Sequence, residues 1–189
     1  TSLLVYDFDN PPNVVTVTAS VPKERKSTVS MLLALTSQNM GRKTIIVDCD
    51  FRLPALSTLV DIAQDGPGIL TFMNGEAGFE EALSVDAQTG LHILMARRRE
   101  ARTLMNPADV LSSKTFEDFV DTLRKIYDLV ILDTPPVLAV SDPRIVAKYV
   151  DKVLYAVRWD ETERGALAQG VKGLRAISAP MAGAVMTQV

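Results

Sequence analysis

A lysine and two hydroxyl residues follow the first β-branched run of the chain at a spacing that suits phosphate binding. Residues 14–18 lead into the run Ser20-Val21-Pro22-Lys23-Glu24-Arg25-Lys26-Ser27-Thr28. A phosphate-binding loop, G-x-x-x-x-G-K-[ST], directs backbone N–H groups and a helix N-terminus at phosphate oxygens. Its lysine reaches the β and γ phosphates, and its hydroxyl residue holds Mg²⁺. Taken alone, Lys-Ser-Thr also fits the ordinary start of a cationic helix.

Aspartates stand at the ends of two further β-branched runs. One run leads into Asp48 and Asp50, and a later one leads into Asp133. Ligands of open α/β sheets bind at the carboxyl ends of strands. A carboxylate at such an end holds Mg²⁺ beside phosphates, because Mg²⁺ takes few carboxylates and keeps several waters. Each aspartate alone fits a cap for the next loop or helix. All three, following the loop in this order, favour nucleotide chemistry.

Four stretches of the chain match the motifs of one protein family. Residues 47–54 resemble I-D-x-D-x-R-x-P, and residues 127–142 resemble Y-D-x-V-I-I-D-T-P-P-V-L-x-x-S-D almost throughout. Residues 106–111 resemble N-P-x-E-L-L, and residues 157–162 resemble V-R-W-x-x-T. From residue 14 onward the chain therefore resembles the cytoplasmic kinase domain of bacterial tyrosine autokinases of capsule and exopolysaccharide export. That family lies within the wider P-loop group of MinD/ParA-like ATPases.

The resemblance implies a set of site residues and a cofactor, Mg·ATP or Mg·ADP if the loop is competent and none otherwise. The implied nucleotide-binding residues are Pro22, Lys23, Glu24, Arg25, Lys26, Ser27 and Thr28. The implied catalytic residues are Lys26, which neutralises transferring charge, and Asp48 or Asp50 as the base for a tyrosine hydroxyl. Ser27, Asp48 and Asp133 are the implied Mg²⁺ ligands.

The loop departs from the family at two positions. The family reads P-G-E-G-K-[ST], whereas this chain has Lys23 and Arg25 in place of the two glycines. Glycine serves where the backbone takes positive φ or closely approaches a ligand, and another residue there costs about 1–2 kcal/mol. The long side chains also occupy space that phosphate needs, which predicts impaired binding. The opposite interpretation is that two extra cations strengthen anion binding.

The ends of the chain also differ from the family pattern. The family's E-x-x-R-x-x-R helix has no counterpart in residues 1–13, and no tyrosine follows Tyr155. If these ends are native, we expect no autophosphorylation of the usual kind. The resemblance implies a partner, the cytosolic tail of a membrane-anchored polysaccharide co-polymerase or activator, and a homo- or hetero-oligomer. It also implies a cytoplasmic protein, held at the inner face of the inner membrane through that partner.

The element pattern predicts one α/β domain. Short β-branched runs alternate with helical spacing, which is typical of a mostly parallel sheet with helices on both faces. We expect an N-terminal arm over residues 1–13 and a P-loop domain over residues 14–189. The expected strands cover residues 14–18, 44–48, 91–95, 129–133, 152–157 and 184–187. The expected helices cover residues 26–38, closed by Gly41, and residues 116–126 and 162–177.

Composition excludes several classes of function. The 189 residues carry a net charge of −3, so nothing global suits the chain to coat nucleic acid, and we expect no nucleic-acid partner. The single cysteine cannot form an internal disulfide, and with the single histidine it cannot build a His/Cys metal cluster. The basic run over residues 97–102 fits a solvated loop better than a contact with nucleic acid, lipid or an acidic partner.

Three functions follow from these observations. The first is a pseudokinase of exopolysaccharide biosynthesis with impaired nucleotide binding, which regulates through a membrane activator. The second is an active, Mg·ATP-dependent tyrosine kinase in the same pathway. The third is a MinD/ParA-like positioning ATPase, which is disfavoured because partition ATPases carry a lysine where this chain has Val21.

Overall fold

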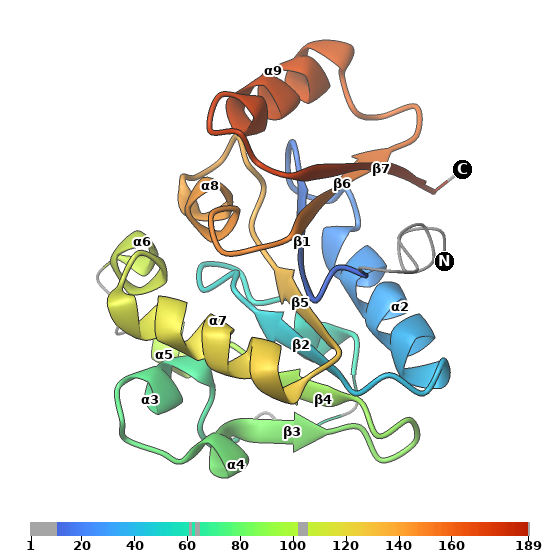
Figure 1. The fold of residues 1–189 in the computed structure, drawn as a ribbon. Helices are drawn as coiled ribbons and strands as arrows, with labels where there is room; N and C mark the ends of the chain where they lie inside the picture. The colour runs from blue at the N-terminus through green and yellow to red at the C-terminus, as the bar shows by residue number, and fades with distance from the viewer. Residues whose placement is uncertain (1–10, 61, 63–64, 102–105, 189) are drawn as a thin grey trace.

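A computed structural model describes residues 11–60, 62, 65–101 and 106–188. They form a seven-stranded sheet in the order β3-β4-β2-β5-β1-β6-β7, and β3 alone runs antiparallel to its neighbour (Figure 1). The strands are β1 (Val14–Ala19), β2 (Thr44–Asp48), β3 (Leu83–Val85), β4 (His92–Leu94), β5 (Leu129–Asp133), β6 (Lys152–Arg158) and β7 (Met181–Thr187). The predicted parallel α/β class is confirmed.

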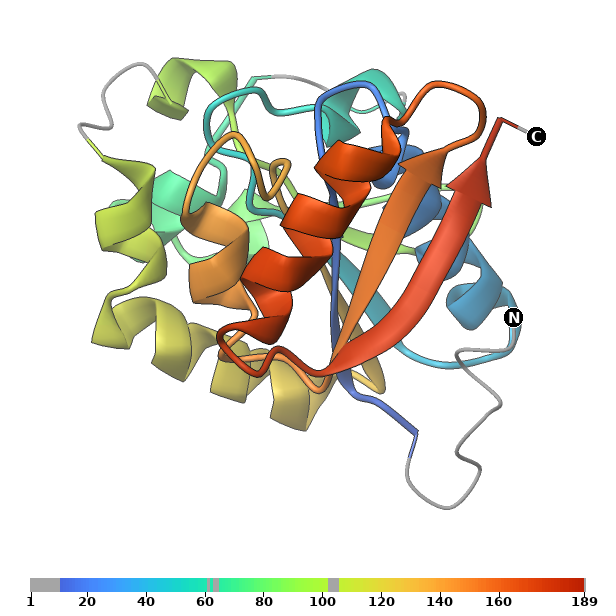
Figure 2. The ribbon, with the colours of Figure 1, turned by 90° about the horizontal axis from the view of Figure 1, so that it is seen from above.

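Helices lie on both faces of the sheet. Figure 2 shows α7, α8 and α9 on one side of the sheet and α2 on the other. The helices are α2 (Lys26–Asn39), η1 (Leu56–Thr58), α3 (Ile69–Met73), α4 (Phe79–Ala82), α5 (Arg98–Ala101), α6 (Pro107–Leu111), α7 (Lys114–Ile126), α8 (Asp142–Val146) and α9 (Arg164–Arg175). The expected N-terminal arm lies mostly outside the described residues.

Side chains that alternate in direction along the central strands form two hydrophobic cores, one on each face of the sheet. Val130 and Leu132 of β5 pack with α7 and α9 on one face, whereas Ile131 packs with α2 on the other. Successive side chains of a strand point to opposite faces, so a strand covered on both sides is mostly apolar. The central strands β1, β2 and β5 are buried along their whole length. This burial holds their carboxyl ends in fixed positions.

Three local features differ from the sequence expectation. The structure adds β3, whose three residues pair antiparallel with β4, and such a short strand has no periodicity to detect. The last strand begins at Met181 rather than residue 184, and the expected helix over 162–177 begins at Arg164 and ends at Arg175. Gly41 does close α2, with φ of 81° and its N–H donating to the carbonyl of Gln38.

Candidate phosphate-binding site

The loop between β1 and α2 keeps a left-handed backbone at both substituted positions. Lys23 has φ of 70° and Arg25 has φ of 62°, although neither is glycine. Both side chains are exposed, as is that of Pro22, while Glu24 between them is buried with 2% of its surface exposed. Non-glycine residues hold such angles only where their surroundings determine them. At both substituted positions the loop therefore has the left-handed backbone for which glycine is usually used.

Helix α2 begins directly at this loop. Arg25 is its N-cap residue and contributes no side-chain cap, and the first turn contains no acidic residue. The first-turn N–H groups of a helix are orphan donors with a partial positive charge, so they favour an anion. Thr28 lies half-buried in this turn. The helix start is thus open toward a phosphate rather than occupied by a carboxylate.

Lys26 and Ser27 meet the predicted carboxylates. The Lys26 Nζ lies 3.0 Å from the Asp50 Oδ2 and 3.8 Å from the Asp133 Oδ2. The Ser27 hydroxyl donates to the Asp133 Oδ2 at 2.6 Å. Asp48 and Asp133 are direct partners in the register of β2 and β5. The two acidic strand ends and the loop lysine, far apart in sequence, therefore converge as predicted.

Asp48 and Asp50 are arranged differently although they stand two residues apart. The Asp50 N–H donates to the Asp48 Oδ1 at 3.0 Å, while the Asp48 Oδ2 is buried and has no hydrogen-bond partner. Asp50 accepts from the Leu53 N–H and pairs with Lys26. A buried carboxylate oxygen without a partner is costly, and it points to a missing donor or cation.

Burial and mutual repulsion shift the titration of these groups. Burial first, and the charges of Asp133 and Asp50 next, raise the pKa of Asp48 well above its ordinary value. Burial also raises the pKa of Asp133, although Lys26 and the Ser27 hydroxyl oppose this shift. Burial alone lowers the pKa of Lys26, but the charges of Asp133 and Asp50 outweigh it and raise the pKa overall. Lys26 therefore stays cationic. Its charge does not offset the burial of Asp48 and Asp133, whose pKa values remain raised.

These observations fit Mg²⁺ at the predicted ligands. The orphan Asp48 oxygen, the Ser27 hydroxyl and Asp133 supply the hard oxygen donors that Mg²⁺ takes. Across the described residues, no group of three or more His, Cys, Asp or Glu side chains could hold a metal ion by itself. Mg²⁺ held at these residues would take phosphate and water oxygens as its other ligands, as is usual in nucleotide sites.

The structure adds site residues that sequence reasoning missed. The Ser30 hydroxyl donates to the Asp133 Oδ1 at 2.8 Å, so both oxygens of this carboxylate accept from α2. The sequence could have indicated Ser30, because it lies one helical turn after Lys26 and faces the same side of the helix. Arg52 and Asp142, which belong to two separate family motifs, form a salt bridge at 3.2 Å.

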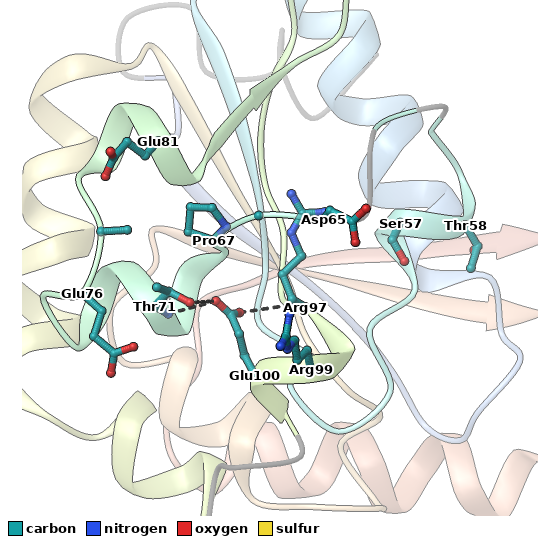
Figure 3. A pocket seen from close by; sticks show the side chains of 12 residues that line it. Ser57, Thr58, Asp65, Pro67, Thr71, Glu76, Glu81, Arg97, Arg99 and Glu100 are labelled. Carbon is teal, nitrogen blue, oxygen red and sulfur yellow. Dashed lines mark hydrogen bonds between the residues drawn. The ribbon is translucent and has the colours of Figure 1, made fainter.

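A cavity lies apart from the phosphate loop. A cavity of about 1100 Å³ is lined by polar side chains of the segments around Ser57, Thr71 and Arg97, and none of its lining residues belongs to the phosphate loop (Figure 3). Glu100 accepts there from the N–H groups of Gly68, Thr71 and Arg97. Arg97 is 6% exposed. The interpretation of residues 97–102 as a solvated loop is therefore wrong, because Arg97 is buried and Arg98–Ala101 form α5; Arg102 lies outside the described residues.

Two other single residues behave as packed side chains. Cys49 is buried between the aspartates, where burial and the charge of Asp48 raise the pKa of its thiol. The His92 Nδ1 lies 2.8 Å from the Tyr127 hydroxyl, a hydrogen bond between neighbouring elements. Within the described ranges, no helix is long and apolar enough to cross a membrane.

Comparison with known proteins identifies the relatives of this chain. The family model described as an AAA domain matches residues 23–174. The tyrosine-protein kinase YwqD of Bacillus subtilis is 27% identical over 98% of this chain and 76% of its own length. The tyrosine-protein kinase Ptk of Acinetobacter johnsonii is 29% identical over 80% of this chain. The chain spans only 20% of the length of Ptk.

A solved structure extends the likeness to three dimensions. The kinase domain of VpsO is 33% identical, covers all of this chain and 90% of its own, and superposes with a TM-score of 0.91. The matched region includes the loop, the acidic strand ends and both layers of helices. The chain therefore belongs to the AAA-domain family of P-loop proteins, among the bacterial tyrosine-kinase domains that its motifs resemble.

Proposed function

We propose that this chain is a tyrosine-autokinase-like domain of bacterial capsule or exopolysaccharide export whose nucleotide binding is impaired. One observation carries the proposal: Lys23 and Arg25 replace the two loop glycines and hold positive φ angles. Their long side chains are attached to the backbone next to the N–H groups that a phosphate would approach. The domain then acts mainly through contact with the cytosolic tail of a membrane-anchored activator, which places it in the cytoplasm beside the inner membrane.

The source of the impairment is steric rather than conformational. Strain in a left-handed residue weakens binding only if the residue relaxes when the ligand is absent. The loop holds left-handed angles at Lys23 and Arg25, and we count their strain as a cost to folding. We expect the loss of affinity to come from the side chains, which compete with phosphate for the space above the loop.

A second candidate is an active Mg·ATP-dependent tyrosine kinase. The convergence of Lys26, Ser27 and three aspartates supports it. In that case Lys26 binds phosphate oxygens, and Asp50, released from Lys26, accepts the proton of the tyrosine hydroxyl. Mg²⁺ at Ser27, Asp48 and Asp133 neutralises phosphate charge when bound.

Calorimetric titration of Mg·ADP and Mg·ATP into the folded domain separates the two candidates. Impaired binding predicts a dissociation constant of about 1 mM or weaker. Micromolar binding that Lys26→Met abolishes would contradict the proposal and favour the active kinase. Titration with a peptide from an activator tail tests the second part, and a folded domain that binds no such tail contradicts the regulatory role.

A further inference from the structure

Glu24, which lies between the left-handed residues Lys23 and Arg25, accepts hydrogen bonds from three other residues. The Glu24 carboxylate accepts from the Val21 N–H at 2.8 Å and from the Thr162 hydroxyl. The Thr187 hydroxyl donates to the Glu24 carbonyl oxygen at 3.1 Å. Glu24 is 2% exposed, so these are the contacts that satisfy a buried acidic residue in an otherwise exposed loop.

The two threonines come from segments that are themselves joined. Thr162 lies in the turn after β6, where its hydroxyl also accepts from the Arg158 N–H at 3.0 Å. Thr187 ends β7, and its carbonyl accepts from the Trp159 N–H at 2.9 Å. The turn after β6 and the end of β7 therefore form one support beneath the loop.

This support restrains a loop that contains two left-handed, non-glycine residues. Left-handed angles at Lys23 and Arg25 are unfavourable by themselves, so the loop would relax unless its surroundings fixed it. Glu24 lies between the two, and fixing both its carboxylate and its carbonyl restrains the backbone on either side. A glycine loop has no such strain and needs less restraint.

We propose that Thr162 and Thr187 are positioning residues that hold the loop in its phosphate-receiving shape through Glu24. The inference rests on the proposed function in taking this loop as the phosphate site. Neither threonine touches the reacting atoms. Their effect passes through the backbone angles of Lys23 and Arg25, so a disturbance of the turn after β6 changes the loop.

Hydrogen exchange of the ligand-free protein, followed by mass spectrometry, tests the support. In Thr162→Val, which keeps the shape but loses the hydroxyl, we expect the amides within residues 21–26 to exchange about tenfold faster than in the wild type. Thr162→Ser keeps the hydroxyl and should stay within about twofold of the wild type. Thr122→Val is the matched control, because its hydroxyl bonds only the Asp118 carbonyl on the exposed face of α7.

A double-mutant cycle separates positioning from general stability. In the Lys23→Gly/Arg25→Gly background, Thr162→Val should accelerate loop exchange by less than about threefold, because glycine needs no restraint. Three results would each overturn the proposal. They are equal acceleration in both backgrounds, acceleration spread over the whole chain, and loop exchange in Thr162→Val that is no faster than in Thr122→Val. No nucleotide is used, so a failure of nucleotide binding leaves this result interpretable.

Discussion

At the scale of single residues, Lys23 and Arg25 distinguish this loop from a glycine loop. Both side chains are exposed, and both backbones are left-handed. Lys26 beside them is paired with Asp50 at 3.0 Å, so an arriving phosphate must draw this ammonium away from a carboxylate. We expect the two long side chains and the Lys26–Asp50 pair to lower nucleotide affinity relative to a glycine loop with a free lysine.

Restoring both glycines should strengthen nucleotide binding. We expect Lys23→Gly/Arg25→Gly to lower the dissociation constant for Mg·ADP about tenfold or more, because it removes two long side chains from the phosphate path. Calorimetry measures the change. The Lys23→Ala/Arg25→Ala variant distinguishes the cause: recovery with alanine indicates side-chain length, whereas recovery with glycine alone indicates a clash at Cβ or backbone strain. Unchanged binding in the glycine variant contradicts the steric account.

At the scale of elements, helix α9 and strand β6 support the start of the loop. The Tyr155 hydroxyl of β6 lies 2.9 Å from the Ser20 hydroxyl, and both residues are fully buried. Gly170 of α9 packs directly against the same tyrosine, so a methyl group there would collide with the phenol oxygen and approach Val137. The close approach of helix and strand depends on this glycine.

Gly170→Ala should destabilise the protein. We expect a loss of about 1–3 kcal/mol in the free energy of unfolding, since overpacking of a buried contact forces the helix away. Gly165→Ala is the control on the same helix, because a Cβ there meets no atom within 4 Å. That variant should gain up to about 1 kcal/mol from helix propensity. Denaturant unfolding measures both, and equal effects at the two positions would contradict the packing argument.

At the scale of the whole molecule, Asp151 ties together elements that stand far apart in the chain. Its carboxylate accepts from the N–H groups of Asn13 and Val14 at the start of β1. It also pairs with Arg124 of α7 at 2.7 Å. Burial alone raises the pKa of Asp151, but the hydrogen bonds from Val14 and Arg124 outweigh burial and lower it below its ordinary value of 3.8.

This shift predicts a pH-dependent contribution to stability. A lowered pKa stabilises the folded state above the ordinary value of 3.8, and the contribution is lost as the pH falls through the lower folded value. Asp151→Asn should therefore lose about 1 kcal/mol near pH 7, a discounted figure because the carboxylate is partly exposed. The difference from the wild type should shrink below pH 3.8.

Thermal unfolding across this range measures the effect of Asp151→Asn. Asp118→Asn is the control, since its carboxylate is 62% exposed and forms only a surface pair with Lys114. A deficit for Asp151→Asn that stays constant with pH would show that packing, rather than charge, is lost.

The sequence by itself determined six of the seven described strands, three of the helices and the placement of the acidic strand ends. Those features follow from local periodicity and from the rule that parallel strands end at one edge, so Asp48 and Asp133 had to lie at the same edge as the loop. Only the tertiary structure decided how Glu24 is held, because its threonine partners lie 138 and 163 residues away in the chain. The same holds for the Arg52–Asp142 pair and the three-residue strand β3. Contacts between distant segments depend on how the packed layers meet, and no local pattern of residues records that geometry.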